Sequence, residues 1–163
     1  MRIRLLAAII AVAGVAAGCG SSAVSPSEKN AGATAAWITA TKFAGVVGDL
    51  QNDTDKIALA TRKHLPVLTM QTLCGILLLD VQSANNDLPA PDRTATKLLA
   101  AAYGDLGAGA NQCFKVRDYG SPLMAKSVEN RSQGLISLAQ ATSHLELVIG
   151  QPIPTTTTTT TMP

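Results

Sequence analysis

Residues that most often carry chemistry are scarce in this chain. Its 163 residues include two histidines, three cysteines and only 3% aromatic residues. No segment matches the H-E-x-x-H zinc motif, the G-x-S-x-G nucleophile elbow, the S-x-x-K motif, the P-loop or the G-x-G-x-x-G fingerprint. We therefore predict that the protein has no catalytic residue, no metal site and no cofactor, and that it is not an enzyme.

The remaining titratable residues do not form a recognisable site. His64 and His144 have no carboxylate or second histidine at a zinc-ligand spacing, so we interpret both as surface residues. Asp80 lies in the most apolar segment but beside its apolar stripe, which favours a partly exposed or hydrogen-bonded aspartate over a catalytic one. We expect three further acidic residues to form a solvated patch: Asp49, Asp53 and Asp55.

The sequence also lacks a basic stripe with interleaved aromatic residues, so nucleic acid is not an expected partner. Beyond the N-terminus, no apolar run reaches the length of about 20 residues that a membrane-spanning helix needs. The most apolar run, residues 74–81, is interrupted by Asp80.

The N-terminal segment has the features of a secretory signal. Arg2 and Arg4 supply two positive charges, and residues 5–17 are almost wholly apolar. This run is too short to span a membrane, but its length suits the central region of a signal peptide, and small residues follow it where a peptidase would cut.

The run ends at Ala16-Ala17-Gly18-Cys19, which resembles the lipobox of bacterial lipoproteins. The resemblance implies cleavage after Gly18 and a diacylglyceryl group on the thiol of Cys19. Ala16 stands where the lipobox usually has a large aliphatic residue. The alternative is an ordinary signal peptide with a cysteine nearby.

Lipidation of Cys19 predicts a protein held on the extracytoplasmic face of the cell membrane, because two or more acyl chains anchor a protein stably. Residues 1–18 are then the signal peptide, and the small, polar residues 19–32 form a flexible tether. Loss of Arg2 and Arg4 lowers Lys plus Arg from 13 to 11, against 11 Asp plus Glu, so the mature chain is near neutral.

Four segments of residues 33–150 show the spacing of three and four that marks one face of a helix. The first stripe is Ala36, Ala40, Phe43, Val47, Leu50, Thr54 and Ile57. The second is Val67, Met70, Cys74, Leu77, Val81, Ala84 and Leu88. The third is Ala95, Leu99, Ala102, Leu106, Gly109, Cys113 and Val116. The fourth is Val128, Leu135, Leu138, Thr142, Leu145 and Ile149, with Arg131 as a misfit.

These stripes, with few β-branched runs of period two, predict an all-α domain. Pro66, the segment 89–91 and Ser121-Pro122 separate the helices, and Asp92 is a good N-cap for the third. Four helices with short connections predict an antiparallel up-down four-helix bundle. A longer first helix or a broken third helix is the alternative. Glycines weaken the third helix by about 1 kcal/mol each unless close packing offsets them.

With Cys19 lipidated, Cys74 and Cys113 remain, and two leftover cysteines in an exported chain usually form a disulfide. The helical register opposes this pairing. A hairpin that turns near residue 89 puts Cys74 level with about residue 104, roughly 13 Å along the helix from Cys113. Two buried free thiols and a redox pair are the alternatives, although no C-x-x-C motif supports the latter.

Residues 151–163 end in seven threonines with flanking prolines, and this composition predicts a disordered tail. The segment resembles the mannosylated segments of actinobacterial lipoproteins. The alternative is a codon repeat without a role. The resemblance implies candidate O-glycosylation sites at Thr155, Thr156, Thr157, Thr158, Thr159, Thr160 and Thr161.

From Cys74 to Cys113 the chain resembles small uncharacterised lipoproteins of mycobacteria and their relatives. The shared pattern is a helical cysteine, a later acidic residue, the segment Leu88-Pro89-Ala90-Pro91-Asp92, residues 98–103 and a second cysteine. The resemblance implies a helical domain at the cell surface and supplies no functional residues.

The sequence leaves three hypotheses for function open. The first is a non-enzymatic helical domain that binds an envelope protein, lipid or glycan, or acts as a scaffold. The second is a phage- or prophage-encoded lipoprotein that blocks superinfection. The third is a small-ligand carrier, or an enzyme with an unrecognised site. The third predicts a concave apolar pocket of several hundred Å³, by order of magnitude, with convergent polar groups.

Overall fold

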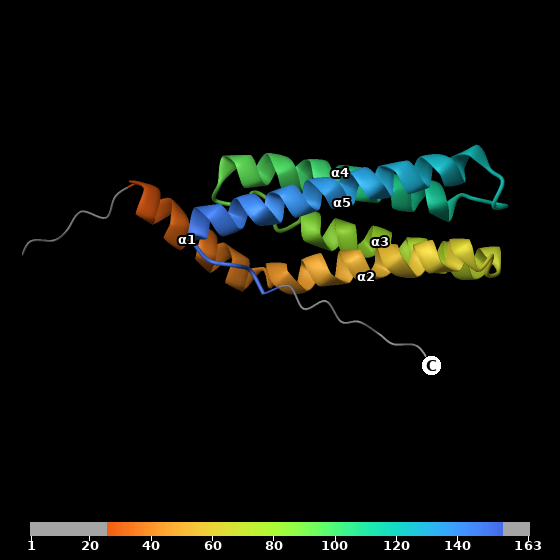
Figure 1. Cartoon of the computed structure of the whole chain (residues 1–163), viewed down its shortest axis with the longest axis horizontal. Coiled ribbons are helices and arrows are strands. Elements are labelled where there is room, and N and C mark those ends of the chain that lie inside the picture. The colour runs from red at the N-terminus through yellow and green to blue at the C-terminus, as the bar shows by residue number, and fades with distance from the viewer. Residues whose placement is uncertain (1–25, 155–163) are drawn as a thin grey trace, which may run out of the picture.

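The computed structural model describes residues 26–154, and these residues form five helices and no strand (Figure 1). The helices are α1 (Pro26–Ala40), α2 (Phe43–Arg62), α3 (Val67–Asn85), α4 (Arg93–Phe114) and α5 (Pro122–Ile149). The predicted all-α class is confirmed, but the described segment has five helices where the sequence predicted four.

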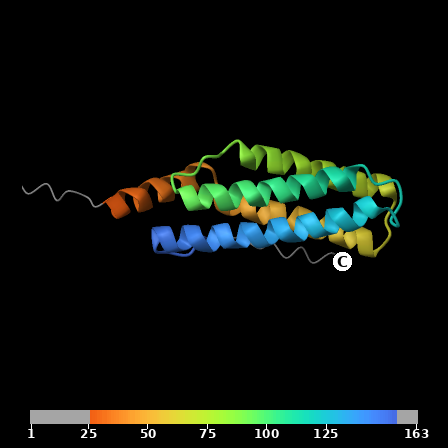
Figure 2. The ribbon, with the colours of Figure 1, turned by 90° about the horizontal axis from the view of Figure 1, so that it is seen from above.

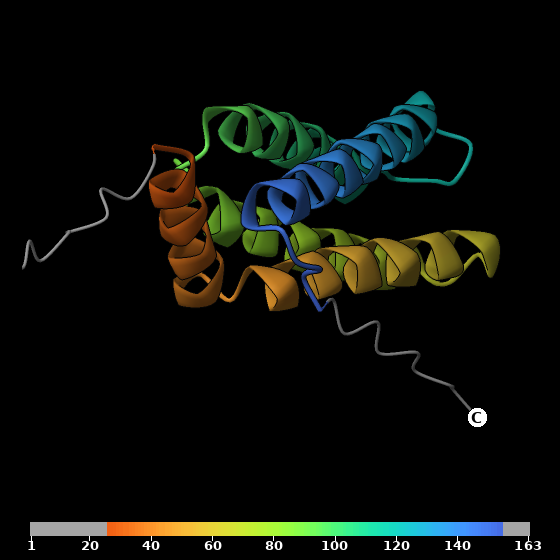
Figure 3. The ribbon, with the colours of Figure 1, turned by 60° about the vertical axis from the view of Figure 1, so that its left-hand side comes forward.

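The additional helix arises because the first predicted stripe breaks at Thr41-Lys42. Lys42 has a φ of 52°, in the left-handed region, and the chain changes direction there before α2 begins. Ala36 and Ala40, predicted to be core residues, are consequently not buried. Figure 3 shows α1 lying across one end of the other helices, where it contacts α5 and α2.

Trp37 fastens α1 to this end of the molecule. Its indole Nε1 donates a hydrogen bond of 2.9 Å to the carbonyl oxygen of Asp87, in the connection between α3 and α4. Its ring lies 5.6 Å from the ring of Phe43, the first residue of α2. The only tryptophan of the chain therefore joins α1 and the start of α2 to the connection between α3 and α4, 50 residues away.

The remaining four helices pack in chain order: α2 against α3, α3 against α4, and α4 against α5 (Figures 1 and 2). Two loops meet at the end opposite α1, because the Tyr119 hydroxyl donates a 2.6 Å hydrogen bond to the carbonyl oxygen of Leu65. Every predicted position of the third stripe is buried, and so are five of the second: Met70, Cys74, Leu77, Val81 and Ala84.

Helices α4 and α5 share the most extensive helix–helix contact, and two glycines allow their close approach. A Cβ added at Gly134 would lie 2.7 Å from Leu106 Cγ and 2.8 Å from the Leu106 backbone nitrogen. A Cβ added at Gly109 would lie 2.6 Å from Arg131 Cγ and 3.0 Å from the Ser127 carbonyl oxygen. Real Cβ atoms do not pack this closely, so neither site has room for a larger residue.

This close approach changes which face of α5 is buried, and the fourth predicted stripe is partly wrong. Leu138 and Leu145 are buried as predicted, but Val128 is 48% exposed. Small and polar residues occupy the interface because bulky ones would push the helices apart. The buried residues of α5 are Met124, Ser127, Arg131, Gly134, Ser137, Leu138, Ala141 and Leu145.

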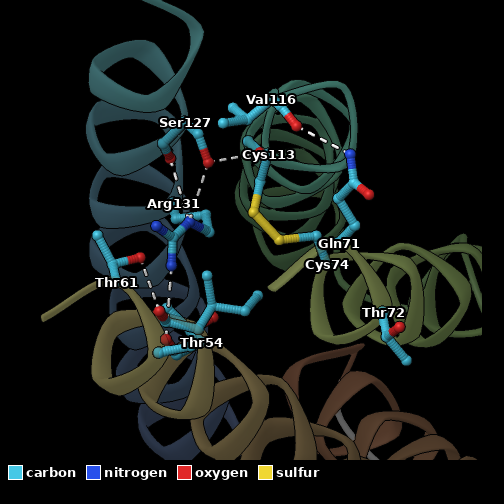
Figure 4. Close-up of a disulfide and its surroundings, with 12 residues drawn as sticks. Thr54, Thr61, Gln71, Thr72, Cys74, Cys113, Val116, Ser127 and Arg131 are labelled. Atoms are coloured by element: carbon cyan, nitrogen blue, oxygen red, sulfur yellow. Dashed lines mark hydrogen bonds between the residues drawn. A yellow bond between two sulfur atoms is a disulfide. The ribbon is translucent and has the colours of Figure 1, made fainter. Parts of the chain in front are cut away.

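Cys74 and Cys113 lie as a disulfide pair between α3 and α4, with Cα atoms 5.9 Å apart (Figure 4). The sequence predicted a hairpin that turns near residue 89, but the structure has the turn further along the chain. Residues 86–92 instead carry the chain along the axis past the end of α3 before α4 begins. Facing pairs have their midpoints within half a residue of position 94: Cys74/Cys113, Gln71/Val116 and Val81/Gly107.

The structure moves two predicted domain boundaries. Helix α1 begins at Pro26, inside the segment 19–32 that was predicted to be a flexible tether. Ile153 is 5% exposed, and its backbone N–H donates a 3.0 Å hydrogen bond to Glu146 Oε1, so the ordered body extends into the predicted tail 151–163. Removing the apolar side chain of Ile153 from water stabilises this position of the segment.

The glycine contacts predict opposite effects for two substitutions. Gly134→Ala lowers the free energy of unfolding by about 1–3 kcal/mol, because its methyl group meets the α4 backbone. Gly104→Ala is the matched control: nothing lies within 4 Å of its added Cβ, so it raises the free energy by up to about 1 kcal/mol. Chemical denaturation monitored by circular dichroism measures both. Equal effects would contradict close packing of α4 on α5.

Candidate functional site

A groove between α2 and α5 is the candidate site. Its volume is about 360 Å³. Apolar side chains, hydroxyl groups and charged groups share its wall. The groove-lining residues are Thr54, Asp55, Ala58, Thr61 and Arg62 of α2, and Val128, Arg131, Ser132 and Leu135 of α5.

Arg131 is the buried charge of this groove, with an exposed fraction of 3%. Its Nε donates to the Ser127 carbonyl oxygen at 3.3 Å and to the Ser127 hydroxyl at 3.2 Å. Its Nη1 reaches across to α2, where the Thr54 carbonyl oxygen lies 3.5 Å away (Figure 4). Ser127 in turn donates a 2.7 Å hydrogen bond to the Gly109 carbonyl oxygen, so Arg131 is held by the α4–α5 interface.

Within residues 26–154, no carboxylate lies within 4.0 Å of the Arg131 guanidinium, and its Nη2 donates no hydrogen bond. Burial lowers the pKa of Arg131 to about 10, so the side chain still carries its charge at neutral pH. A buried cation with only neutral acceptors is costly, because its charge is removed from water without a counter-ion.

An acidic cluster joins α2 to α3, and part of the predicted solvated patch is corrected here. Asp49 and Asp55 are not buried, in keeping with the prediction, but Asp53 is only 6% exposed. Its Oδ1 accepts a 2.9 Å hydrogen bond from Lys56 Nζ. The pKa of Asp80 is raised to about 6, first by burial and then by a hydrogen bond to Asp53 and the charges of Asp53 and Asp49, against the opposing effect of Lys56.

The two histidines lie at opposite ends of the helices. His64 is exposed, as predicted, and stacks on Tyr119 at a centroid distance of 5.0 Å. His144 is only partly exposed, because its Nε2 lies 2.9 Å from Oδ1 of Asp92. The described residues contain no group of three or more histidine, cysteine or acidic side chains that could hold a metal ion.

Asp92 caps α4 as predicted, and it also links three helices. Its Oδ1 accepts a 2.8 Å hydrogen bond from the Ala95 backbone N–H, and its Oδ2 accepts one of 3.3 Å from Asn30 of α1. The Ala95 N–H lowers the pKa of Asp92 most, and hydrogen bonds to His144 and Asn30 lower it further.

Helix α3, which contains the most apolar run of the sequence, leaves an apolar ridge exposed. We call Leu68, Ile76, Leu79 and Phe114 the α3 ridge; their exposed fractions are 74%, 43%, 66% and 50%. Phe114 of α4 belongs to it because its ring lies over Gly75 of α3. Among the described helices, α3 alone is long and apolar enough to cross a membrane, a test that core helices of soluble proteins also pass.

Two more grooves flank the bundle. One, of about 590 Å³, lies between α3 and α4, and burial raises the pKa of Tyr103 in its wall. The other, of about 360 Å³, lies where residues 151–154 cross α1 and the start of α2. Neither has a buried charge in its wall.

Several predicted site residues lie outside the described residues: Gly18, Cys19 and Thr155–Thr161. The chain matches no model of a protein family, no curated protein and no solved structure. No residue role is therefore transferred from another protein, and geometry and sequence alone support the proposed roles. The sequence analysis did not predict that Arg131 is a buried charge beside a groove. Its position on the apolar stripe of the fourth helix could have indicated this burial.

The Asp80 environment predicts a specific pH dependence. The folded state raises the pKa of Asp80 from 3.8 to about 6, so this group destabilises the fold when it is ionised. Its penalty is present above pH 6 and disappears as the pH falls toward 4. We expect Asp80→Asn to be more stable than the parent protein at about pH 7.5, and this advantage to shrink at about pH 5, as measured by thermal unfolding.

A difference between Asp80→Asn and its parent that stays constant between these two pH values would show that Asp80 does not titrate there.

Proposed function

We propose that the protein is a lipid-anchored cell-envelope protein whose helical body is a non-enzymatic binding domain. The exposed α3 ridge carries this proposal, because several large apolar side chains exposed on one side of a folded body are typical of an interaction site. The lipobox-like sequence at Cys19 supports anchoring on the extracytoplasmic face of the membrane.

We further propose that α2–α5 form an antiparallel up-down four-helix bundle, with α1 as a cap across one end. Two observations support this description. Consecutive helices are those that pack together, and the connections between them are short, at residues 63–66, 86–92 and 115–121. The disulfide supports a fold that is built for an oxidising compartment.

An envelope protein is the partner we favour for the α3 ridge. Leucine, isoleucine and phenylalanine supply apolar area but no charge, so a glycan would find few hydrogen-bond partners there. The ridge is also too narrow to replace a membrane-spanning helix, because Asp80 and Gln82 of α3 lie beside it.

Anchoring is tested by Cys19→Ala in cells that express the full chain. We expect the variant to remain uncleaved at Gly18 and to lose incorporation of a fatty-acid analogue completely, because the acceptor thiol is gone. Ser21→Ala, two residues later, is the matched control and should be labelled like the parent protein. Equal labelling of Cys19→Ala and the parent would refute the lipid anchor.

Binding is tested by photocrosslinking in intact cells. A photoreactive residue at Leu79, on the α3 ridge, should give a discrete crosslinked species, whereas one at Gln140, exposed on α5, should not. Leu79→Lys should weaken capture from the neighbouring position Ile76, because a charge in an apolar contact is costly. Identical capture from Leu79 and Gln140 would refute the ridge as the binding surface.

A further inference from the structure

Arg131 is a charged side chain that lines an open groove, and residues 26–154 supply it with hydrogen-bond acceptors but with no carboxylate within 4.0 Å. It lines the α2–α5 groove while only 3% of it is exposed, and its Nη2 has no acceptor within residues 26–154. Its Nη1 contact with the Thr54 carbonyl oxygen is long, at 3.5 Å. The outer edge of the guanidinium, Nη1 and Nη2, is therefore the edge that is least well satisfied.

We propose that this groove binds a single-chain carboxylate amphiphile, with its carboxylate on Arg131. A carboxylate matches the guanidinium with two parallel hydrogen bonds, and binding on the Nη1/Nη2 edge gives up only the long contact to Thr54. This site is separate from the α3 ridge and does not depend on the lipid anchor.

The apolar part of the groove wall favours an alkyl chain as the group attached to the carboxylate. Ala58 of α2 faces Val128 and Leu135 of α5 across the same groove, and these side chains offer an apolar surface to an alkyl chain. Val128 is 48% exposed because the close α4–α5 contact turns it out of the core. The volume of about 360 Å³ is at the lower end of the range for small-molecule sites, which favours a medium-length chain over a two-chain lipid.

Charges at the rim favour one negative charge rather than several. Arg62 lines the groove and adds a second, exposed cation. Asp55 lines it as well and repels additional negative charge. Arg131 and Arg62 against Asp55 leave the wall with a net charge of +1, so one carboxylate neutralises the groove, whereas a doubly charged phosphate would leave an excess negative charge there.

The probe is decanoate, compared with decanol and acetate, in titrations of the purified protein followed by amide NMR. We expect saturable decanoate binding, with shifts confined to Thr54, Ala58 and Ser132, and at least about tenfold tighter than decanol. Acetate, which lacks the chain, should show no saturable binding. Arg131→Met keeps the unbranched stem of the side chain without the guanidinium group, and should reduce decanoate affinity at least about tenfold.

Arg131→Met removes a buried group, so a second variant tests the groove without touching it. Ser132→Tyr fills the groove from its exposed rim and should reduce decanoate affinity at least about tenfold, whereas Gln133→Tyr, exposed outside the groove, should leave it unchanged. Absence of saturable binding, equal affinity for decanol, shifts outside the groove, or an unaffected Ser132→Tyr variant would each overturn the proposal.

Discussion

The backbone contact between α4 and α5 determines the arrangement of the other functional features. Gly134 of α5 packs against the backbone of α4 at Leu106, and Gly109 of α4 packs against Ser127 and Arg131 of α5. Both contacts are so close that a Cβ would not fit at either glycine. Two helices that approach this closely must fill their interface with small residues. The larger side chains of α5, Val128 and Leu135, are thereby displaced to the flank, where they form one wall of the α2–α5 groove.

Polar contacts orient the segments at the two ends of the molecule, in addition to the apolar packing there. Trp37 binds the Asp87 carbonyl oxygen at the α1 end, and Tyr119 binds the Leu65 carbonyl oxygen at the other. Asp92 joins α1, α4 and α5 through three different partners. In a chain with 3% aromatic residues, an aromatic side chain that also donates a hydrogen bond can both pack and orient a loop.

Sequence periodicity predicted α3 and α4 well because both helices bury a conventional apolar stripe. It failed at α5, because the buried face there contains Ser127, Arg131 and Gly134, which periodicity treats as polar or breaking residues. Asp53 was placed outside for the same reason, although it lies three residues after Leu50 and four before Ile57, both fully buried. The break at Lys42 was invisible, because a left-handed lysine has no sequence signature.

Arg131 belongs both to the buried face of α5, which periodicity did not predict, and to the wall of the α2–α5 groove. The α4–α5 contact buries its stem against Gly109, and Ser127 fixes its Nε, so the guanidinium is directed toward α2 and not toward solvent. An apolar side chain at this position would avoid the cost of burying a charge. Because residues 26–154 give this charge backbone and hydroxyl acceptors but no carboxylate within 4.0 Å, a negatively charged group that enters from the groove would supply its counter-ion.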